Sequence, residues 1–571
     1  MKKKNKIVQF FKWLVVIVII AFVLLAIVFD FSTRIDEPVI KDKSVVKLQR
    51  VKRAKDFYLV DNNMLRKNRY GLWEMYLEGK PFDMGVASGK LTKELIEVQE
   101  NAFVEQINKM IPSKFYLHFL KYFIAWFDRD IDEYIPESYK EEIYGISLSC
   151  SHKYDFIAPP YQRMLNYHGA HDIGHALTDL AMVGCTSFGV NKGEQSNNLL
   201  IGRNFDFYVN DDFAKNKIVA FVNPDDGYKF AYVTWASMIG VVSGMNEKGL
   251  TVTINAAKSD IPTKAATPIS IVARAILQHA QNIAEARKIA GDFQTFVSES
   301  ILIGSAQDDE VAIIEKSPSK TGFYTTDTNF IVCANHYQST TFANDPKNIE
   351  NIKTSPSLYR ENRCKQLIRK YEKEGAFEQN QAAMVLRDKL GMNDKNIGLG
   401  NEKAMCQLIS HHSVIFEPKQ LKMWVSVNPW QLNNYICYDL SRVFKIVKSI
   451  LPTQPLDEPG LIINKDPFLD SQPYFSFLKF KKLKNEVRQS IRSKEPLADE
   501  QNVIFGMLNA NPEYYYGYKL AGDYYFTFDN HKKALSFYKM SLTKEYENSA
   551  SKQEVKKRVD KLKNEVAVGK K

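Results

Sequence analysis

The pattern of apolar and polar positions begins with a distinct amino-terminal segment. An unbroken apolar run from Trp13 to Phe29 follows the basic start Met1-Lys2-Lys3-Lys4-Asn5-Lys6. At helical rise this run is about 25 Å long, which is near the lower limit for crossing a bilayer core. No small-residue cleavage site follows it, so the pattern favours an uncleaved anchor over a signal peptide. Because basic residues stay on the cytoplasmic side, we expect everything after Asp30 to be exported, either periplasmic or extracellular.

The segments after the anchor differ in their periodicity. From Asp36 to Glu142 charged and aromatic residues alternate at helical spacing, which predicts a mostly helical region. Residues 197–256 instead carry short strand patterns separated by turn signals, which are typical of an antiparallel meander. A helix is predicted from Pro268 to Ala290, with Thr267 as its N-cap and Arg274 on its outward face.

The second half of the chain alternates strand and helix patterns and then becomes helical. A helix is predicted over 359–390, and strands are predicted over 300–305, 310–315, 330–334, 412–416 and 422–427. After Pro467 the pattern is helical, and residues 511–543 look like one tetratricopeptide repeat of helix, turn and helix. One such unit cannot bury its own apolar face, so it should pack on neighbouring helices or on a partner protein.

Composition and charge exclude some classes of protein. The chain has 571 residues, which is too long for one core, and it is 45% hydrophobic and 25% charged, as globular proteins are. Its net charge of +11 is spread over lysine-rich helical stretches and both ends, without an aromatic-interleaved basic groove, so no nucleic-acid partner is expected. The six cysteines are widely spaced, which argues against a disulfide scaffold but leaves a single pair open.

Cys185 is the candidate nucleophile. It follows a hydrophobic segment that ends in Gly184, and the sequence Gly202-Arg203-Asn204-Phe205-Asp206-Phe207 comes shortly after it. A lone cysteine is most often a buried small hydrophobe, so these neighbours decide the interpretation. A thiol with a pKa near 8.5 is mostly protonated at neutral pH and needs a base. If Cys185 became a chain terminus, its own α-amino group could take the proton.

Two further motifs follow in the same order as in a known family. They are Cys333-Ala334-Asn335-His336-Tyr337 at the end of a predicted strand and Ser357-Leu358-Tyr359-Arg360 at the start of a predicted helix. Together with the motifs around Cys185 they resemble the N-terminal nucleophile hydrolases, specifically the acyl-coenzyme A:6-aminopenicillanic acid acyltransferase family and the related choloylglycine hydrolases. The resemblance covers about half of the chain, from Gly184 to roughly Leu440. It implies an α+β fold, a four-layer αββα sandwich.

The resemblance also implies that the protein cuts its own chain. In that family the cysteine attacks the peptide bond before it and then works as a new amino-terminal residue, here Cys185 after cleavage at Gly184. A glycine at the cleavage position tolerates the strained backbone that such an attack requires.

The family implies roles for five other residues. Arg203 and Asp206 match positions that flank the nucleophile and hold its amino group. Asn335 matches a donor to the oxyanion, and such a donor is worth roughly 3 kcal/mol of transition-state stabilisation. Asn255 and Arg360 match substrate-binding positions. Read from the residues alone, Arg203 and Asp206 could form a surface ion pair, the asparagines could cap strands, and Arg360 could face solvent.

Two alternatives from other classes stay open. One is a zinc hydrolase: His168, His171 and His175 would share one face of a helix and could bind zinc with Asp172 or Asp179. However, two glycines in that segment weaken the helix that this geometry requires. The other alternative is an envelope interaction or scaffold protein, in which an inactive hydrolase-like core and the tetratricopeptide-like tail bind another protein.

The sequence therefore predicts a membrane-anchored, self-cleaving cysteine amidohydrolase or acyltransferase that acts on small N-acyl amides, linear or cyclic. It is expected to use no cofactor and no metal. Hydrolysis is favoured, because an exported site has little access to acyl-coenzyme A. We expect a cytoplasmic tail and anchor (1–30), a largely helical pro-segment (31–184), a catalytic domain (185–465) and a helical tail (466–571). The substrate, its acyl group and the oligomeric state stay open.

The anchor gives a first testable prediction. Full-length protein should stay with the membrane fraction after washing with alkaline carbonate, because the run from Trp13 to Phe29 is buried among lipid chains. The measurement is an immunoblot of pellet and supernatant. A soluble form whose amino terminus lies just past Asp30 would show that the segment is a cleaved signal peptide.

Overall fold

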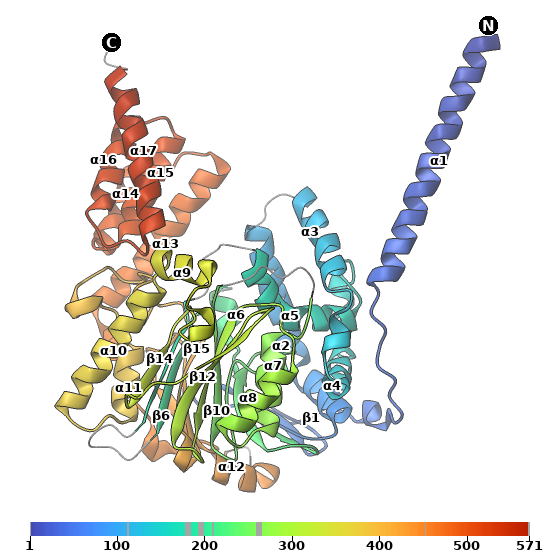
Figure 1. Cartoon of the computed structure of the whole chain (residues 1–571), viewed down its shortest axis with the longest axis vertical. Helices are drawn as coiled ribbons and strands as arrows, with labels where there is room; N and C mark the ends of the chain where they lie inside the picture. The colour runs from blue at the N-terminus through green and yellow to red at the C-terminus, as the bar shows by residue number, and fades with distance from the viewer. Residues whose placement is uncertain are drawn as a thin grey trace.

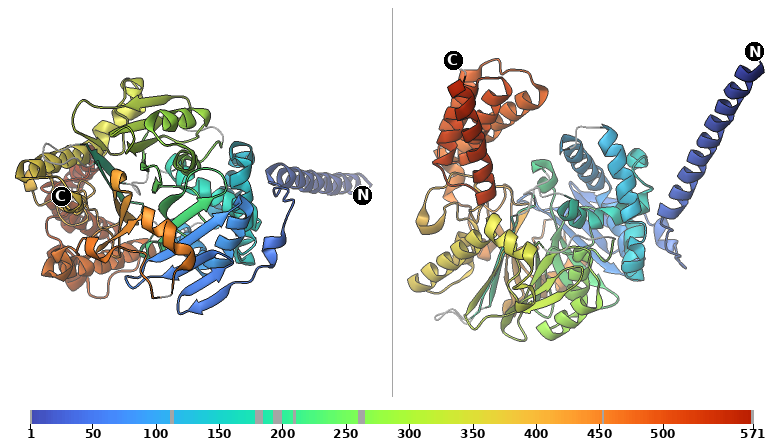
Figure 2. Two further views of the ribbon diagram at one scale, coloured as in Figure 1. Left: turned by 90° about the horizontal axis from the view of Figure 1, so that it is seen from below. Right: turned by 45° about the horizontal axis from the view of Figure 1, so that its top comes forward.

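The computed structural model describes residues 2–110, 114–177, 184–191, 199–207, 210–258, 265–451 and 453–568. Two β-sheets form the centre of the molecule, helices cover the sheets, and a separate group of helices forms the C-terminal part (Figure 1). Helix α1 (Lys2–Thr33) extends away from the rest of the chain in all three views (Figures 1 and 2). Its segment Phe10–Thr33 is long and apolar enough to cross a membrane, a property that signal sequences share.

The larger sheet has eleven strands in the order β1-β2-β3-β4-β7-β8-β9-β10-β11-β12-β13. The strands are β1 (Val51–Ala54), β2 (Phe57–Val60), β3 (Asn63–Lys67), β4 (Trp73–Gly79), β7 (Ile218–Pro224), β8 (Phe230–Thr234), β9 (Ser243–Asn246), β10 (Leu250–Ala256), β11 (Glu299–Ser305), β12 (Glu310–Lys316) and β13 (Thr321–Tyr324). Neighbouring strands are antiparallel except β4 and β7, which pair in parallel from Trp73 with Ile218 to Gly79 with Pro224. Segments on both sides of Cys185 therefore share one sheet.

Residues 36–80 differ from the helical expectation, because they form a short 3-10 turn and strands β1–β4. Their charged residues explain the error. Arg66 and Glu74, on paired strands, are buried and form an ion pair with 2.7 Å between Nε and Oε2. The sequence pattern indicates that these charges lie on the solvent-exposed face of a helix. In the structure they lie inside the sheet, where they neutralise each other.

The second sheet has six strands in the order β14-β5-β6-β15-β16-β17. The strands are β5 (Thr186–Val190), β6 (Leu200–Phe205), β14 (Phe330–Cys333), β15 (His412–Glu417), β16 (Lys422–Ser426) and β17 (Tyr435–Asp439). Strand β6 was expected in the meander but pairs with β5 and β15 here, so the meander consists of β7–β10. The strands expected over 300–305, 310–315, 330–334, 412–416 and 422–427 are confirmed.

The two sheets pack against each other through an apolar core. Val219 and Phe221 of the larger sheet and Val414 and Phe416 of the smaller sheet belong to this core. Helices α2 (Pro81–Met110), α4 (Glu137–Ser147), α5 (Pro160–Leu177), α7 (Ile269–His279) and α8 (Ile283–Asp292) contribute to a second core with the larger sheet. Helices α10 (Ser357–Glu374) and α11 (Gln379–Leu386) contribute to a third core with the smaller sheet. The remaining helices of this part are α3 (Lys114–Phe127), α6 (Asp211–Lys215), α9 (Pro346–Thr354) and α12 (Leu440–Ile446).

The helix expected over 268–290 is two helices, α7 and α8. Asn282 separates them, since its side chain accepts a hydrogen bond from the Glu285 N–H and so caps α8. The residue before α7 is Pro268, not Thr267. Arg274 does not face solvent but is fully buried, with 3.2 Å between its Nη2 and Oε2 of Glu142. The ion pair makes this burial tolerable.

The C-terminal part consists of α13 (Gln472–Ser493), α14 (Glu500–Ala510), α15 (Tyr515–Thr527), α16 (His531–Leu542) and α17 (Ser549–Val568). Helices α15 and α16 form the helix–turn–helix pair that the pattern predicted over 511–543, and its assignment as a tetratricopeptide repeat stays a prediction. This part shares an apolar core with the region of the two sheets, in which Trp430 contacts Phe477 with ring centroids 6.1 Å apart.

Helices α2 and α4 approach each other closely through two glycines. A Cβ atom on Gly85 would collide with the backbone carbonyl of Glu142, and one on Gly145 would lie 2.6 Å from the Val86 nitrogen. The absence of both side chains therefore sets the distance between these helices, which in turn cover the larger sheet.

We expect Gly85→Ala to destabilise the protein by about 1 to 3 kcal/mol, because the added methyl group forces α4 away from α2. Gly291→Ala is the matched control: it lies in α8, a Cβ there meets no atom within 4 Å, and alanine favours a helix. The measurement is the thermal unfolding midpoint of both variants. Equal midpoints for Gly85→Ala and the wild type would contradict this role of Gly85.

Candidate active site

Cys185 lies directly before β5, and its side chain is buried. Its Sγ is 3.8 Å from Nη2 of Arg203 on the neighbouring strand β6. Arg203 is itself fully buried and donates hydrogen bonds to the Val242 carbonyl, the Ser243 hydroxyl and the Ile254 carbonyl. Arg203 is therefore not a surface residue, and the larger sheet holds its guanidinium beside the sulfur.

The electrostatics of the site keep the thiol protonated. Burial raises the pKa of Cys185 to about 11, although the charge of Arg203 acts in the opposite direction. Burial also raises the pKa of Asp206 to about 7, against a hydrogen bond from Ser410 and the charges of Arg360 and Arg203. The thiol therefore needs a base at neutral pH, and Asp206 changes its protonation state in that range.

The carbonyl group of Gly184 accepts two hydrogen bonds from side chains. Nη1 of Arg360 lies 2.5 Å and Nε2 of Gln407 lies 2.8 Å from this oxygen. Arg360 also donates to the Cys185 carbonyl (2.7 Å) and the Thr186 hydroxyl (2.8 Å), so it spans the backbone on both sides of the Gly184–Cys185 bond. Two donors on one carbonyl oxygen favour negative charge on that oxygen.

Position 184 needs a glycine for a reason other than backbone strain. It does not adopt the left-handed conformation. A Cβ atom on it would instead collide with the side-chain amide of Gln407. Glycine is needed here because Gln407 approaches the backbone closely while it also contacts Asp206, with 3.2 Å between Nε2 and Oδ2.

The two candidate asparagines, Asn335 and Asn255, donate hydrogen bonds to backbone carbonyls at the ends of strands. Oδ1 of Asn335 accepts a hydrogen bond from Nη2 of Arg360 (2.6 Å), and its Nδ2 donates to the Ala256 carbonyl (2.9 Å). Nδ2 of Asn255 donates to the carbonyls of Cys333 (2.6 Å) and Ala334 (3.2 Å). Asn335 is thus joined to the site through Arg360, whereas Asn255 holds the end of β14. The oxyanion role of Asn335 and the substrate-binding roles of Asn255 and Arg360 stay predictions.

Sequence reasoning missed the segment before β15. Gln407 and Ser410 both donate to the carboxyl group of Asp206. His412 lies 2.9 Å from the Ser243 hydroxyl, which in turn holds Arg203. Burial lowers the pKa of His412 well below its usual value, so the ring is neutral. The available signal was the polar run Ser410-His411-His412-Ser413 leading into a buried strand, because buried polar groups need partners.

The histidine cluster is not assembled as a metal site in the part of the chain that is described. His168 is fully buried; its Nδ1 donates to the Met164 carbonyl (2.8 Å), and its Nε2 accepts from the Ile239 N–H (3.0 Å). Both ring nitrogens are therefore used inside the protein. The side chains of His171 and His175 lie outside the described residues. Among the described residues no group of three or more potential ligands could hold a metal ion. All six cysteines are free thiols.

Part of the chain is similar to a known protein family. Residues 192–429 match the family model described as acyl-coenzyme A:6-aminopenicillanic acid acyl-transferase. The match includes Arg203, Asp206, Asn335, Arg360 and Gln407 but begins after Cys185. The matched segment covers less than half of the chain.

Individual relatives are distant. Protein dcd1B of Dictyostelium discoideum is 22% identical over 263 residues, which are 43% of this chain and 50% of that protein. The match thus spans half the length of this curated relative. Among solved structures, an N-acylethanolamine-hydrolyzing acid amidase ortholog of Caenorhabditis elegans has a TM-score of 0.30 and 17% identity, covering 41% of this chain and 93% of that one. A conjugated bile acid hydrolase of Clostridium perfringens has a TM-score of 0.29 and 12% identity, covering 49% and 96%.

Proposed function

We propose that the protein is a membrane-anchored, self-cleaving amidohydrolase or acyltransferase of the N-terminal nucleophile type, with four αββα layers and Cys185 as its nucleophile. One observation carries this proposal. The carbonyl of Gly184, the residue before Cys185, accepts hydrogen bonds at its oxygen from Arg360 and Gln407. A buried thiol, a neighbouring guanidinium and a polarised carbonyl are the parts that an acyl-transfer reaction requires.

Self-cleavage needs a base other than the nitrogen of Cys185, which is an amide in the uncut chain. Asp206, with a pKa of about 7, can accept the thiol proton. The sulfur then attacks the Gly184 carbonyl carbon, and Arg360 and Gln407 stabilise the negative charge on its oxygen. When the carbon–nitrogen bond breaks, the nitrogen of Cys185 takes a proton and becomes an amine. The resulting thioester between Gly184 and Sγ is hydrolysed by water, which frees the thiol.

Turnover uses the new amino group. With a typical pKa of about 7.7 to 8, an α-amino group can accept the thiol proton at neutral pH. The acyl carbonyl of a substrate would take the position of the Gly184 carbonyl beside Arg360, and Asn335 would assist there as an oxyanion donor. The sulfur forms a thioester, the amine leaves with a proton, and water or an acceptor amine releases the acyl group. Hydrolysis fits an exported site better than acyl transfer from coenzyme A.

A small cavity lies near the residue that contacts the sulfur. Phe207, Phe213 and Trp235 line it together with Gln99, Glu100 and Ser237, and its volume is about 40 Å³. Phe205 stacks on Phe207 and also lies under the Arg203 guanidinium, 4.3 Å from ring centroid to Cζ. A cavity of this size holds only water molecules. The proposed N-acyl amide substrate is therefore supported by the acyl-transfer groups around Cys185 and not by this cavity.

The scaffold alternative makes a different demand on the same residues. A protein that only binds a partner through its C-terminal helices needs no polarised carbonyl beside a thiol, and buried charges without a chemical role lower stability. Arg203, Asp206 and Arg360 are all fully buried. Their burial around Cys185 favours the enzyme.

Cleavage is tested by the masses of the chains. We expect fragments 1–184 and 185–571, of about 21 and 44 kDa in proportion to the 65.6 kDa of the chain, and the larger should begin Cys-Thr-Ser-Phe-Gly. Cys185→Ala should stay uncut, because a methyl group cannot attack a carbonyl, whereas Cys185→Ser should cut slowly. The measurement is mass spectrometry with amino-terminal sequencing. Folded wild-type protein that stays uncut would rule out the proposal.

Gln407 should assist cleavage. Gln407→Met keeps the length of the side chain but removes the donor to the Gly184 carbonyl, so cleavage should slow by about 100-fold. Gln278→Met is the matched control: Gln278 is also buried, and its Nε2 donates to the Asp226 carbonyl at 2.7 Å, between α7 and the β7–β8 turn. The measurement is the time course of fragment appearance on a denaturing gel. Equal rates for Gln407→Met and the control would show that this contact does not assist the reaction.

A further inference from the structure

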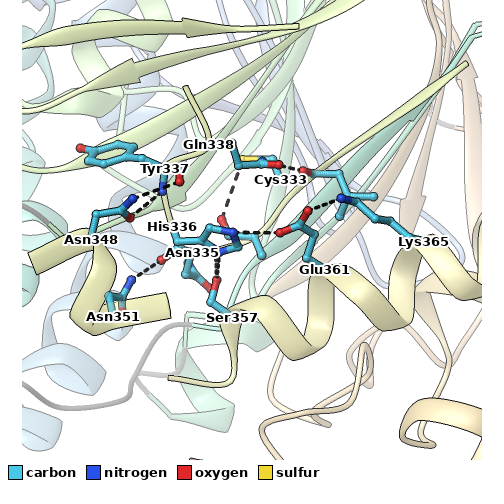
Figure 3. A network of polar contacts seen from close by, with 12 residues as sticks. Cys333, Asn335, His336, Tyr337, Gln338, Asn348, Asn351, Ser357, Glu361 and Lys365 are labelled. Carbon is cyan, nitrogen blue, oxygen red and sulfur yellow. Dashed lines mark hydrogen bonds and ion pairs between the residues drawn. The ribbon is translucent and has the colours of Figure 1, made fainter. Parts of the chain in front are cut away.

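A chain of hydroxyl, imidazole and carboxylate groups lies behind Arg360. The Ser357 hydroxyl is 2.7 Å from Nδ1 of His336, and Nε2 of the same ring is 2.8 Å from Oε2 of Glu361. Figure 3 shows Ser357 and Glu361 pointing from helix α10 towards His336, which follows strand β14. The order of groups is that of a serine hydrolase triad, so its role has to be decided from its surroundings.

The surroundings of Ser357 do not suit a nucleophile. Its side chain is fully buried, and its oxygen accepts a hydrogen bond from the Asn335 N–H, at 2.6 Å. His336 and Glu361 are buried as well. A nucleophilic hydroxyl must instead be open to substrate on the side away from its base. Ser357, His336 and Glu361 therefore have a structural role.

The direction of each hydrogen bond between Ser357, His336 and Glu361 follows from the charge on Glu361. Burial opposes ionisation of Glu361, but hydrogen bonds from His336 and Lys365 outweigh it and lower the pKa of this carboxyl group. An ionised Glu361 accepts the Nε2–H of His336, which leaves Nδ1 as an acceptor for the Ser357 O–H. The Ser357 oxygen then keeps its lone pairs for the Asn335 N–H. In this arrangement every group of the chain is satisfied, with one orientation for each.

The hydrogen bonds between Ser357, His336 and Glu361 attach the start of α10 to the segment that follows β14. Ser357, Arg360 and Glu361 are three and four residues apart and so share one face of the helix. Ser357 and Glu361 hold His336, and Arg360 donates to Oδ1 of Asn335 at 2.6 Å. From the other side, the side chain of Asn351 on α9 donates to the Asn335 carbonyl at 2.6 Å, as Figure 3 shows.

Arg360 depends on this attachment for its position. All the hydrogen bonds that it donates to Gly184, Cys185, Thr186 and Asn335 end on neutral oxygen atoms. Burial lowers the pKa of Arg360 to about 10. Neutral acceptors hold a buried guanidinium less tightly than a carboxylate does, so a small displacement of Asn335 or of α10 would move Arg360 away from the Gly184 carbonyl.

We propose that Ser357, His336 and Glu361 form a positioning network that fixes Asn335 and, through it, Arg360 against the reacting carbonyl. The inference rests on the proposed function, since the carbonyl in question is that of the self-cleavage reaction. The three residues touch neither the sulfur nor the carbonyl in the structure, so they act through Asn335 and Arg360.

The test measures the rate of self-cleavage in full-length protein, which needs no substrate. Ser357→Ala and Glu361→Leu should slow cleavage by about 10- to 100-fold, the size of effect expected from a displacement near 1 Å. Glu361→Gln keeps an acceptor for the Nε2–H of His336 and should restore most of the rate. Lys373→Met, an exposed position on the same helix, should cut at the wild-type rate. Circular dichroism and thermal unfolding check that each variant is folded.

A double-variant cycle separates positioning from general stability. Ser357→Ala should slow cleavage much less in an Asn335→Ala background than in the wild type, because both changes release the same guanidinium. The inference is overturned if folded Ser357→Ala cuts at the wild-type rate, if its effect multiplies fully with that of Asn335→Ala, or if Glu361→Gln is as slow as Glu361→Leu. Should Ser357→Ala fail to fold, the comparison of the two Glu361 variants decides. A wild-type protein that never cuts overturns the proposed function, and the inference falls with it.

Discussion

The burial of charge around Cys185 is the constraint on which the rest of the structure depends. Arg203, Asp206 and Arg360 have no access to solvent, and a charge in that position is costly unless hydrogen bonds replace water. The replacements come from widely separated parts of the chain: Val242 and Ile254 for Arg203, and Ser410 for Asp206. The sheets have to be assembled before these groups can be accommodated. The site is therefore a consequence of the complete fold.

The parallel pairing of β4 with β7 has a consequence for a cut chain. Strands β1–β4 come before Cys185 and strands β7–β13 come after it, yet all of them lie in one sheet. Separation of the two fragments would break seven residue pairs of this ladder and would expose the apolar residues on both faces of β4. Cleavage at Gly184 would thus change the chemistry at Cys185 while the sheet continued to hold both fragments together.

Local motifs in the sequence named most residues of the candidate site. In the structure Arg203 lies beside the sulfur of Cys185, and Arg360 contacts both the Cys185 carbonyl and Asn335, while the roles of these residues stay predictions. Gln407 was missed because its contact with Gly184 joins residues 223 positions apart, a distance at which a single sequence gives no signal. Strands β1–β4 were missed for a related reason. The side chains of Arg66 and Glu74 look solvent-facing until the two strands pair and bring the charges together.

Some side chains also have more than one use, and only their partners decide between them. Asn255 is a candidate for substrate binding, and its amide nitrogen also holds the end of β14. His168 was a candidate ligand, but both of its nitrogens are bonded inside the protein. In each case the residue type was compatible with chemistry and with packing alike. A sequence gives the donors and acceptors of a residue, whereas the fold determines which groups they meet.

The two raised pKa values near Gly184 bear on the two reactions proposed for this site. Burial raises the pKa of the Cys185 thiol to about 11 and that of the Asp206 carboxyl to about 7, so proton transfer from the thiol to this carboxylate is unfavourable. In the proposed scheme that cost would slow the attack on the backbone and make it depend on the donors at the carbonyl. Cleavage would place an amine, with an ordinary pKa of about 8, on the residue that carries the same sulfur. The proposed first reaction would therefore be a slow, single event, and its product would supply the base for the second reaction.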